Sequence, residues 1–514
     1  MVYALSSSSK LFSRLNGVAV SLLLGSLGGC MVGPKDKAPA LPKHADYNAT
    51  PFTQTSGRNT GNSILRKQFF VNGMDVSGQW WEVFQNPKLN RLVEEALANN
   101  QSLKAMQAGL KASWEQRRVE GAALYPSISA QFIPSRNKTS KTLSPVPNSN
   151  EWLYNLHTAQ LNIGYVPDLW GGTRNAIKAA SAQADIQQAQ LEATALTMIS
   201  NLVNATIIEA GVRAQIHAKE AQIAEQRQVL AIQKKQNGLG DLSRQSTLIQ
   251  RDALAQIEAD LPPLKNQLAQ TRDQIAVLVG VPPNEDLPIF ELKDFTLPEK
   301  LPVSLPSALL EHRPDIQAAR AQIKAAAAQV GIAIANRLPN VQLSALPGQA
   351  VGHMSEFFKP GYGNWEIAAT VTQPIFQGGS LLHAQREARD NLLQANEYYK
   401  STVISAIGDV ADSLHAVQFD SDTLMADQNG LDAAEASLRI AQAQHRFGDN
   451  SQIDLIQARL SVIQDQLSVA QDETARFSDT VGLFQSLGGG WWHRDDLGVS
   501  PQKAKYLSNT LVPW

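Results

Sequence analysis

Two long tracts without proline occupy matching positions in the two halves of this chain. No proline occurs between Pro167 and Pro262 or between Pro374 and Pro501, although the sequence holds 25 prolines. Each tract follows a short alternating segment, a proline and a Gly-Gly pair, and then continues as a long stretch rich in Ala, Gln and Leu. Similarity on this scale within one chain indicates one structural unit that is built twice.

The two halves also keep the same register along these tracts. Pro374 lies 207 residues after Pro167, and the turn at Gly448 lies 208 residues after the turn at Gly240. Two unrelated helices of similar composition would not hold their turns and prolines to within one residue of a common offset. The sequence therefore predicts two copies of a long helical hairpin.

The length of the first tract restricts how it can pack. From Gly172 to Asn237 a continuous helix would extend roughly 100 Å, whereas helices in globular proteins average about 11–12 residues. Such a helix cannot bury itself in a compact core and must pack beside others as a coiled coil or a helical tube. Polar residues recur every few positions, as in Glu225-Gln226-Arg227-Gln228, which indicates helices in water rather than in lipid.

Four shorter segments alternate between apolar and polar residues, as β-strands with two different faces do. We expect these strands at about 126–134, 157–166, 340–347 and 364–373. Strands of about 9–11 residues with this pattern fit a transmembrane β-barrel with a polar lumen. A soluble sheet with one buried face fits the pattern equally well. Because open strand edges are not tolerated in lipid, four strands would need further chains to close a barrel.

The N-terminus has the pattern of a secretory signal peptide. Lys10 and Arg14 precede an apolar run, 18–27, that is too short to span a membrane as a mature helix. Leu27-Gly28-Gly29-Cys30 follows, and Cys30 is the single cysteine of the chain, which excludes an intramolecular disulfide. We expect residues 1–29 to be removed; a cysteine placed there by chance is the alternative.

Composition and motifs argue against several other functions. The net charge is −2 with 18% charged residues, and no basic patch suggests a nucleic-acid partner. The nine histidines are scattered, without HExxH, and we find no P-loop, G-x-S-x-G or metal-spaced cluster. We therefore predict no enzyme activity, cofactor or metal site. A structural coiled-coil lipoprotein and an enzyme on a helical scaffold are the rival classes.

Several motifs in order carry a resemblance to a known family. They are the start Met31-Val32-Gly33-Pro34, the stretch YVPDLWGGTR at 165–174, RPDIQAA at 313–319 and PIFQGG at 374–379. Over about residues 30–490 the chain resembles TolC-like outer-membrane efflux channels (outer membrane factors). The second motif is similar to the signature of the NodT-type lipoprotein branch found in RND-type efflux systems.

The resemblance implies a mainly α-helical fold with a membrane β-barrel. Each chain would supply four strands, and a homotrimer would close a twelve-stranded barrel above a periplasmic tube of long helices. Cys30 would become the lipidated first residue, and Met31 in place of an aspartate suggests the outer membrane. The expected partners are a periplasmic adaptor (membrane fusion) protein, an inner-membrane efflux pump and outer-membrane lipid.

The function implied is passive conduction of small amphiphilic compounds or drugs from the pump across the periplasm and outer membrane. The alternative is the outer-membrane exit duct of a type I protein secretion system. We divide the chain into six parts. They are a signal peptide (1–29), a lipidated N-terminal extension (30–80), a first repeat (81–280), an equatorial linker (281–306), a second repeat (307–489) and a C-terminal tail (490–514).

The tips of the two hairpins, near 238–243 and 447–451, are the expected adaptor contacts and the place where the duct would close. The contact candidates are Gly238, Leu239, Gly240, Phe447, Gly448 and Asn450, and the gate candidates are Asp241, Asp449, Asp454 and Gln457. Asp454 resembles a gate position, but a solvated helix residue is its alternative reading. Gln457 stands where many relatives carry the gate aspartate.

One feature breaks the symmetry of the repeat. Leu261-Pro262-Pro263-Leu264 interrupts the first hairpin after its tip, and the second half has no proline at the equivalent place. Two prolines remove two backbone donors, so they predict a kink or a split in this helix.

Overall fold

The computed structural model describes residues 31–40, 47, 52–58, 63–138, 153–303 and 312–494. The chain divides into two compact units, each assembled from segments of both repeats. The sheet unit comprises Met1–Pro39, Lys111–Ile186 and Arg320–Tyr398, and the hairpin unit comprises Ala40–Leu110, Gln187–Ala319 and Tyr399–Trp514. Cys30 and the signal peptide lie outside the described residues.

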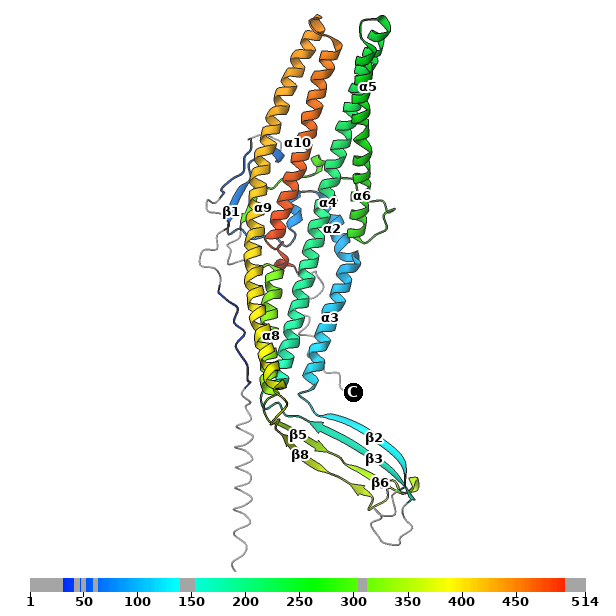
Figure 1. The fold of residues 1–514 in the computed structure, drawn as a ribbon, viewed down its shortest axis with the longest axis vertical. Coiled ribbons are helices and arrows are strands. Elements are labelled where there is room, and N and C mark those ends of the chain that lie inside the picture. The colour runs from blue at the N-terminus through cyan, green and yellow to red at the C-terminus, as the bar shows by residue number, and fades with distance from the viewer. Residues whose placement is uncertain are drawn as a thin grey trace, which may run out of the picture. The chain divides into compact units, whose positions relative to one another are not determined.

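Helices make up most of the described chain (Figure 1). The first repeat contains α2 Pro87–Asn99, α3 Gln101–Ala122, α4 Gly172–Leu239, α5 Arg244–Ala259 and α6 Leu261–Val279. The second repeat contains α8 Pro314–Ala335, α9 Ser380–Phe447 and α10 Gln452–Ser486. The helices α4 and α9 hold equivalent places in the repeat and are both 68 residues long. In each copy a helix, two strand segments, a very long helix and a return helix therefore follow one another.

The prolines at 262 and 263 split the return helix of the first hairpin into two. The first part, α5, ends at Ala259, and α6 begins at Leu261 with the prolines in its first turn. The missing N–H groups cost little there, because the first N–H groups of a helix have no intrahelical partner. The equivalent helix α10 has no proline and runs unbroken for 35 residues.

The sheet unit contains four strand positions in the described residues. The strands are β2 Ser127–Lys138, β3 Leu153–Tyr165, β5 Asn340–Ala345, β6 Gly348–Val351, β7 Gly363–Asn364 and β8 Ile367–Thr372. Both β5 and β6 pair with β3, and β8 and β7 pair with β5 and β6 in turn. The order is therefore β2, β3, β5 with β6, and β8 with β7, all antiparallel, as Figure 1 shows.

The hairpin unit packs around aromatic side chains at the middle of its helices. Phe84 and Phe295 both contact Phe477 of α10, with ring centroids 6.1 and 5.8 Å apart. Trp80 stacks on Phe484, two turns further along α10, with ring centroids 5.5 Å apart. These rings come from the short helix Trp80–Phe84, the linker and α10, so one core joins the N-terminal extension and the linker to the helices.

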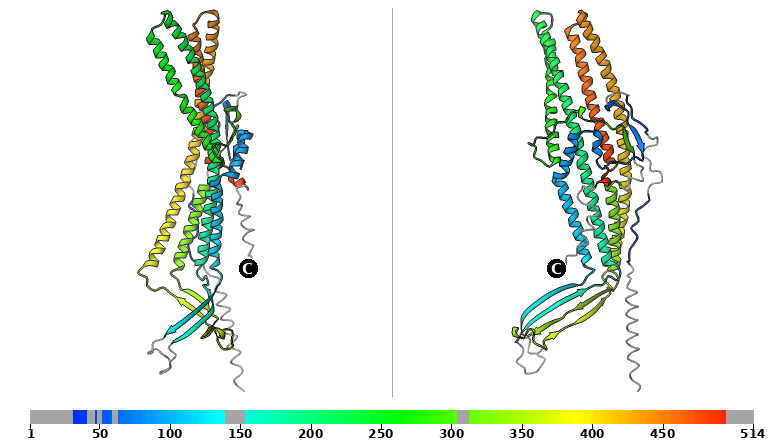
Figure 2. Two further views of the ribbon diagram at one scale, coloured as in Figure 1. Left: turned by 90° about the vertical axis from the view of Figure 1, so that its right-hand side faces the viewer. Right: turned by 180° about the vertical axis from the view of Figure 1, so that it is seen from behind.

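Part of the N-terminal extension lies against α9 and α10 in the same unit. The strand β1, Phe69–Asn72, pairs in parallel with β4, Lys300–Val303, of the linker. Residues 52–58 and 63–72, which we call the strap, are held by Arg476 of α10. The strap also contacts α9, because the backbone N–H of Ser56 donates to the hydroxyl of Ser421. The strap and the linker strand β4 therefore lie side by side against the helices of the hairpin unit, which Figure 2 shows from two further sides.

One window of α4 has a mean hydropathy of 1.3, which by length and composition would suffice to cross a membrane. The polar spacing of the tract did not suggest such a span. In the structure 72% of that window is buried against the rest of the chain. A buried core helix passes the same test, so the window is explained by packing.

Candidate functional site

The register of the sheet collects apolar side chains on one face. Ile128 of β2 lies opposite Ile163 of β3, which lies opposite Ala345 of β5, which in turn lies opposite Ile367 of β8. Ile128 and Ile367 are 68% and 74% exposed in the single chain. Ile163 and Ala345 between them are half-buried. An apolar row that crosses all four strand positions and is exposed at its two ends is what a lipid-facing surface requires. The register thus favours the membrane interpretation over a soluble sheet.

The opposite face carries hydrogen-bonded polar side chains. Gln131 of β2 lies opposite Gln160 of β3. The Gln160 amide donates to Asn162 over 2.8 Å, and the Asn162 amide donates to Gln131 over 3.1 Å. Because side chains alternate between faces along a strand, these three residues share the side opposite to Ile128 and Ile163. This face can line a water-filled lumen.

Both lateral edges of the sheet lack a partner among the described residues. Strand β2 pairs with β3 alone, and β8 pairs with β5 alone. An unpaired edge exposes a row of N–H and C=O groups, which cannot be left unsatisfied in lipid. The single chain is therefore incomplete as a membrane structure.

The tip of the first hairpin is a tight glycine turn. Helix α4 ends at Leu239, and Gly240 has a φ of +86°, a conformation that favours glycine. Ser243 then caps α5 by accepting from the backbone N–H of Ser246. Leu239 is 70% exposed, and Asp241 is also exposed. The predicted contact residues Gly238, Leu239 and Gly240 thus lie together at this tip.

The second tip repeats this geometry with a stronger cap. Gly448 has a φ of +81°, and Phe447 beside it is 79% exposed. The Asn450 amide turns back and donates to the Ala441 carbonyl over 3.1 Å, which satisfies the end of α9. Asp449 lies exposed in the same turn. The described residues include no hydrogen bond or ion pair that joins the two tips of one chain.

The structure gives Asp454 a local role at the start of α10. Its carboxylate accepts from the backbone N–H and from the hydroxyl of Ser451, at 3.0 and 2.7 Å, and the Ser451 hydroxyl accepts from the Asp454 N–H. This reciprocal arrangement is a capping box. The hydrogen bonds from Ser451 lower the pKa of Asp454. Gln457 lies exposed one turn further along the helix.

Two pairs of aspartates, which no sequence motif marks, face each other between α9 and α10. Asp479 faces Asp420, and two turns away Asp472 faces Asp427. Burial, together with the neighbouring carboxyl groups, raises the pKa of Asp479 to about 8 and that of Asp472 to about 6. The equal spacing of seven residues on both helices was the available signal.

Replacing Asp479 with asparagine is expected to change how stability depends on pH. The ordinary pKa is 3.8 and the folded value is about 8, so between them the folded chain holds a proton that the unfolded chain has lost. The free energy of unfolding of the wild type therefore falls as pH rises through this interval. As the pH rises from about 5 to about 8, we expect the melting temperature of Asp479→Asn to fall less than that of the wild type. The exposed Asp412→Asn on α9 is the control, and parallel pH profiles for all three proteins would contradict the prediction.

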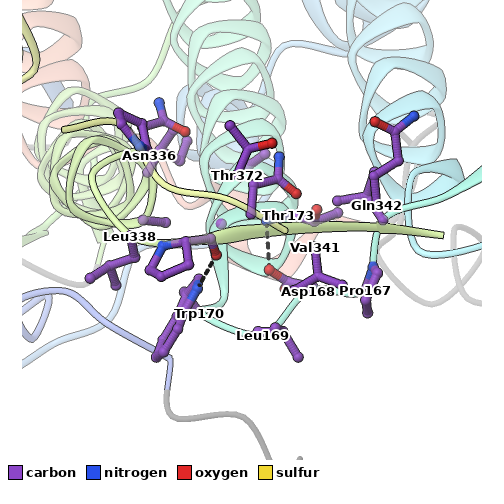
Figure 3. Close-up of a pocket in the computed structure, with 18 residues that line it drawn as sticks. Pro167, Asp168, Leu169, Trp170, Thr173, Asn336, Leu338, Val341, Gln342 and Thr372 are labelled. Carbon is purple, nitrogen blue, oxygen red and sulfur yellow. Dashed lines mark hydrogen bonds between the residues drawn. The ribbon is translucent and has the colours of Figure 1, made fainter. Parts of the chain in front are cut away.

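The junction between β3 and α4 contains the second motif of the resemblance and borders a cavity (Figure 3). The Asp168 carboxylate accepts from the backbone N–H groups of Thr173 and Arg174 at 3.1 and 3.0 Å, and from the Arg174 side chain at 2.9 Å. Burial alone would raise the pKa of Asp168, but these hydrogen bonds lower it overall. Asp168 therefore caps α4 and joins the strand to the helix.

Comparisons with known proteins agree with this geometry. The sequence profile of the family described as "Outer membrane efflux protein" matches residues 92–281 and 305–489. The antibiotic efflux pump outer membrane protein ArpC of Pseudomonas putida is 25% identical over 484 residues, 93% of this chain and 96% of that protein. The pyoverdine export outer membrane protein OpmQ of Pseudomonas aeruginosa is 27% identical over 487 residues, 93% of this chain and 97% of that protein.

Solved structures show the same fold. The outer membrane protein VceC of Vibrio cholerae superposes with a TM-score of 0.72 at 27% identity, covering 81% of this chain and 100% of that chain. The CmeC outer membrane channel of Campylobacter jejuni has a TM-score of 0.77 at 21% identity, covering 93% of this chain and 98% of that chain.

Within the described residues, no group of three or more His, Cys, Asp or Glu side chains could hold a metal ion.

Proposed function

Because the chain belongs to the outer membrane efflux protein family, we propose that it is the passive outer-membrane duct of a tripartite efflux system. The observation that carries this proposal is the sheet, which has one exposed apolar face, one hydrogen-bonded polar face and two open edges. Such a sheet fits a segment of a barrel with a watery lumen and does not fit a closed soluble core.

The open edges call for further copies of the same chain. Three chains with four strand positions each would join β2 of one copy to β8 of the next and leave no edge unpaired. A homotrimer would also place the long helices around one axis as a periplasmic tube. Lipidation of Cys30 would then attach each copy to the outer membrane.

The hairpin tips are the proposed contacts to a periplasmic adaptor, which would connect the duct to an inner-membrane pump. Each tip presents an exposed apolar side chain, Leu239 or Phe447, directly beside its glycine turn. Threefold symmetry would repeat Asp241, Asp449, Asp454 and Gln457 as rings of three at the narrow end of the duct. Rings of carboxylates near the axis would favour cations.

Small-molecule efflux is favoured over export of proteins. The two sequence relatives described above are named for antibiotic efflux and for pyoverdine export, and in both cases the exported cargo is a small compound. We propose that the cargo here is also small and amphiphilic, with export of a protein by a type I system as the alternative. A deletion strain tested against dyes, detergents and antibiotics separates the two, since the protein exporter would leave these sensitivities unchanged.

The test of the duct itself is a planar-bilayer recording on purified protein, combined with its mass in detergent. We expect discrete conductance steps from a particle with the mass of three chains. A monomer without conductance would contradict the proposal and favour a structural coiled-coil lipoprotein.

The same recording can test the gate. We expect Asp454→Ala to raise conductance and to admit a large antibiotic into cells, because it removes a ring of carboxylates. Ser451→Ala is the matched control, since it weakens the capping box but keeps the carboxylate. If Asp454→Ala and Ser451→Ala leaked equally, the effect would come from helix capping. If Asp454→Ala changed neither conductance nor leakage, Asp454 would not be part of the gate.

A further inference from the structure

The apolar face of the sheet becomes cationic at the end of β2 that lies away from the helices. Strand β2 follows α3 and leads away from it, as Figure 1 shows. Ile128 and Phe132 of this strand lie on the apolar face. Because side chains alternate between the two faces, Arg136 and Lys138 lie on the same face, closer to the end of the strand. Arg136 comes four residues after Phe132, which places it roughly 13 Å further from the helices.

No acidic side chain of the two neighbouring strands offsets this positive charge. The sequences of β2 and β3, SISAQFIPSRNK and LYNLHTAQLNIGY, contain neither Asp nor Glu. Arg136 is exposed and lies opposite the neutral Asn155 of β3. Within the described part of the chain its guanidinium has no hydrogen bond or ion pair. Such a guanidinium is suited to bind an anion such as phosphate through two parallel hydrogen bonds.

A loop between β6 and β7 folds over the same face of the sheet. It comprises residues 352–362, and its Phe357 ring contacts the ring of Phe132 on β2, with centroids 6.0 Å apart. The Phe358 N–H donates to the Gln349 side chain over 2.9 Å. Gln349 belongs to the apolar face because it lies in register with Phe132 across β3. The loop is therefore fixed to this face by a ring contact and a hydrogen bond.

The backbone of this loop holds Phe358 in an exposed position. Its φ is +66°, a left-handed value that bulky residues rarely adopt, and the residue is 92% exposed. A strained backbone and a phenylalanine ring in water both cost free energy. Contact with lipid would recover the second cost, and aromatic side chains are enriched at the boundary between lipid and water. Phe358 is therefore placed as an anchor at that boundary.

The loop adds a second cation, and its carboxylate is engaged elsewhere. Lys359 is exposed, and within the described residues its ammonium group has no hydrogen bond or ion pair. Glu356 is the single acidic residue between 351 and 364. Its carboxylate accepts from the backbone N–H groups of His353 and Gly352 and from the Tyr362 hydroxyl. These hydrogen bonds close the loop on itself, so Lys359 keeps its charge for a group outside the chain.

We propose that this part of the apolar face binds phosphate-bearing lipids of the outer leaflet. Its rings are Phe132, Phe357 and Phe358, and its cations are Arg136 and Lys359. The proposal rests on the orientation proposed above, in which the helices lie in the periplasm and the far end of the sheet reaches the outer leaflet. The rings continue the lipid-facing surface of the sheet, and the cations are complementary to phosphate groups of the lipid. Binding would fix the depth of the chain in the membrane, because the cations stay level with the phosphates.

The test is native mass spectrometry of the purified full-length protein in detergent, titrated with lipid A, a phosphorylated glycolipid. The matched probe is the same lipid after removal of its phosphates, which we expect to bind much more weakly. Arg136→Gln combined with Lys359→Gln is expected to weaken binding of lipid A about tenfold, because two cations that attract the phosphates are lost. Lys235→Gln combined with Arg251→Gln is the control, since it removes one exposed lysine and one exposed arginine from α4 and α5. The control should bind lipid A as the wild type does.

Three results would overturn the proposal. They are equal affinity of the wild type for both lipids, unaltered binding of lipid A by the Arg136 and Lys359 double variant, and an equal loss of binding in the control. Arg136→Lys keeps the charge and is expected to retain most of the binding, which separates lost charge from lost fold. The bilayer recording uses no lipid A, so it decides the duct function separately from this result.

Discussion

Replacing Arg476 with alanine is expected to lower the free energy of unfolding by about 3–5 kcal/mol, the largest effect of any single substitution proposed for the hairpin unit. The guanidinium of Arg476 is fully buried in α10. It donates to the carbonyls of Ile64 and Arg66 at 2.6 and 2.8 Å, and to the side chains of Gln68 and Thr55 at 3.2 and 3.3 Å.

The size of this effect follows from what the substitution leaves behind. Burial lowers the pKa of Arg476 to about 10, and no carboxylate is bonded to it among the described residues. The hydrogen bonds to the strap therefore compensate for the desolvated charge. Alanine would leave several buried acceptors without a donor, at a cost of about 1–3 kcal/mol each, and a cavity beside them.

The measurement is the melting temperature together with limited trypsin digestion. We expect earlier melting and faster cleavage at Arg66 and Lys67, because the strap loses its attachment to α10. Arg476→Met keeps the volume but not the donors and should behave like Arg476→Ala. Arg439→Ala on α9 is the control, since that side chain is 68% exposed and lies 4.0 Å from Glu435. Unchanged protease resistance in Arg476→Ala would show that the strap is held by other contacts.

Introducing arginine at Leu161 is expected to prevent stable insertion, whereas arginine at the neighbouring Gln160 should be tolerated. Leu161 lies opposite Ala130 on the apolar face and is 44% exposed. Gln160 lies opposite Gln131 on the polar face. An arginine that faces lipid costs about 2–4 kcal/mol near the bilayer midplane and less toward the interfaces, whereas one in the lumen stays in water.

The two variants differ by one position in the same strand, so they separate the faces of the sheet from general effects on folding. We expect Leu161→Arg to lose the heat-resistant oligomer and its bilayer conductance. Gln160→Arg should keep both and shift conductance toward anions, because it adds a positive charge to the lumen. If Gln160→Arg were the variant that failed to insert, the assignment of the faces would have to be reversed.

Much of the fold could be predicted from local patterns. The paired proline-free tracts predicted two long helices, and the structure contains α4 and α9 at 68 residues each. The alternating segments predicted the strands, and the prolines at 262 and 263 predicted the break between α5 and α6. These features depend on spacing along the chain, which a single sequence displays directly.

The pairing between distant segments was not available from those patterns. Nothing local to β3 reveals that Ile163 lies opposite both Ile128 and Ala345, yet that register decides between a membrane sheet and a soluble one. The same holds for Arg476, which reads in the sequence as one more polar residue of a helix. Its burial depends on the strap, which is far away in the sequence. Ile64, for example, precedes Arg476 by 412 residues.

The sequence by itself determined the duplicated hairpins, the glycine turns at their tips and the alternation of the strands, because backbone geometry sets periods of 3.6 and 2.0 residues that need no partner. Only the tertiary structure decided the side-by-side order of the strands, the aspartate pairs between α9 and α10, and the attachment of the strap to Arg476. Those features arise where segments far apart in the chain meet, and the free energy of such contacts depends on the surface that each segment finds opposite it.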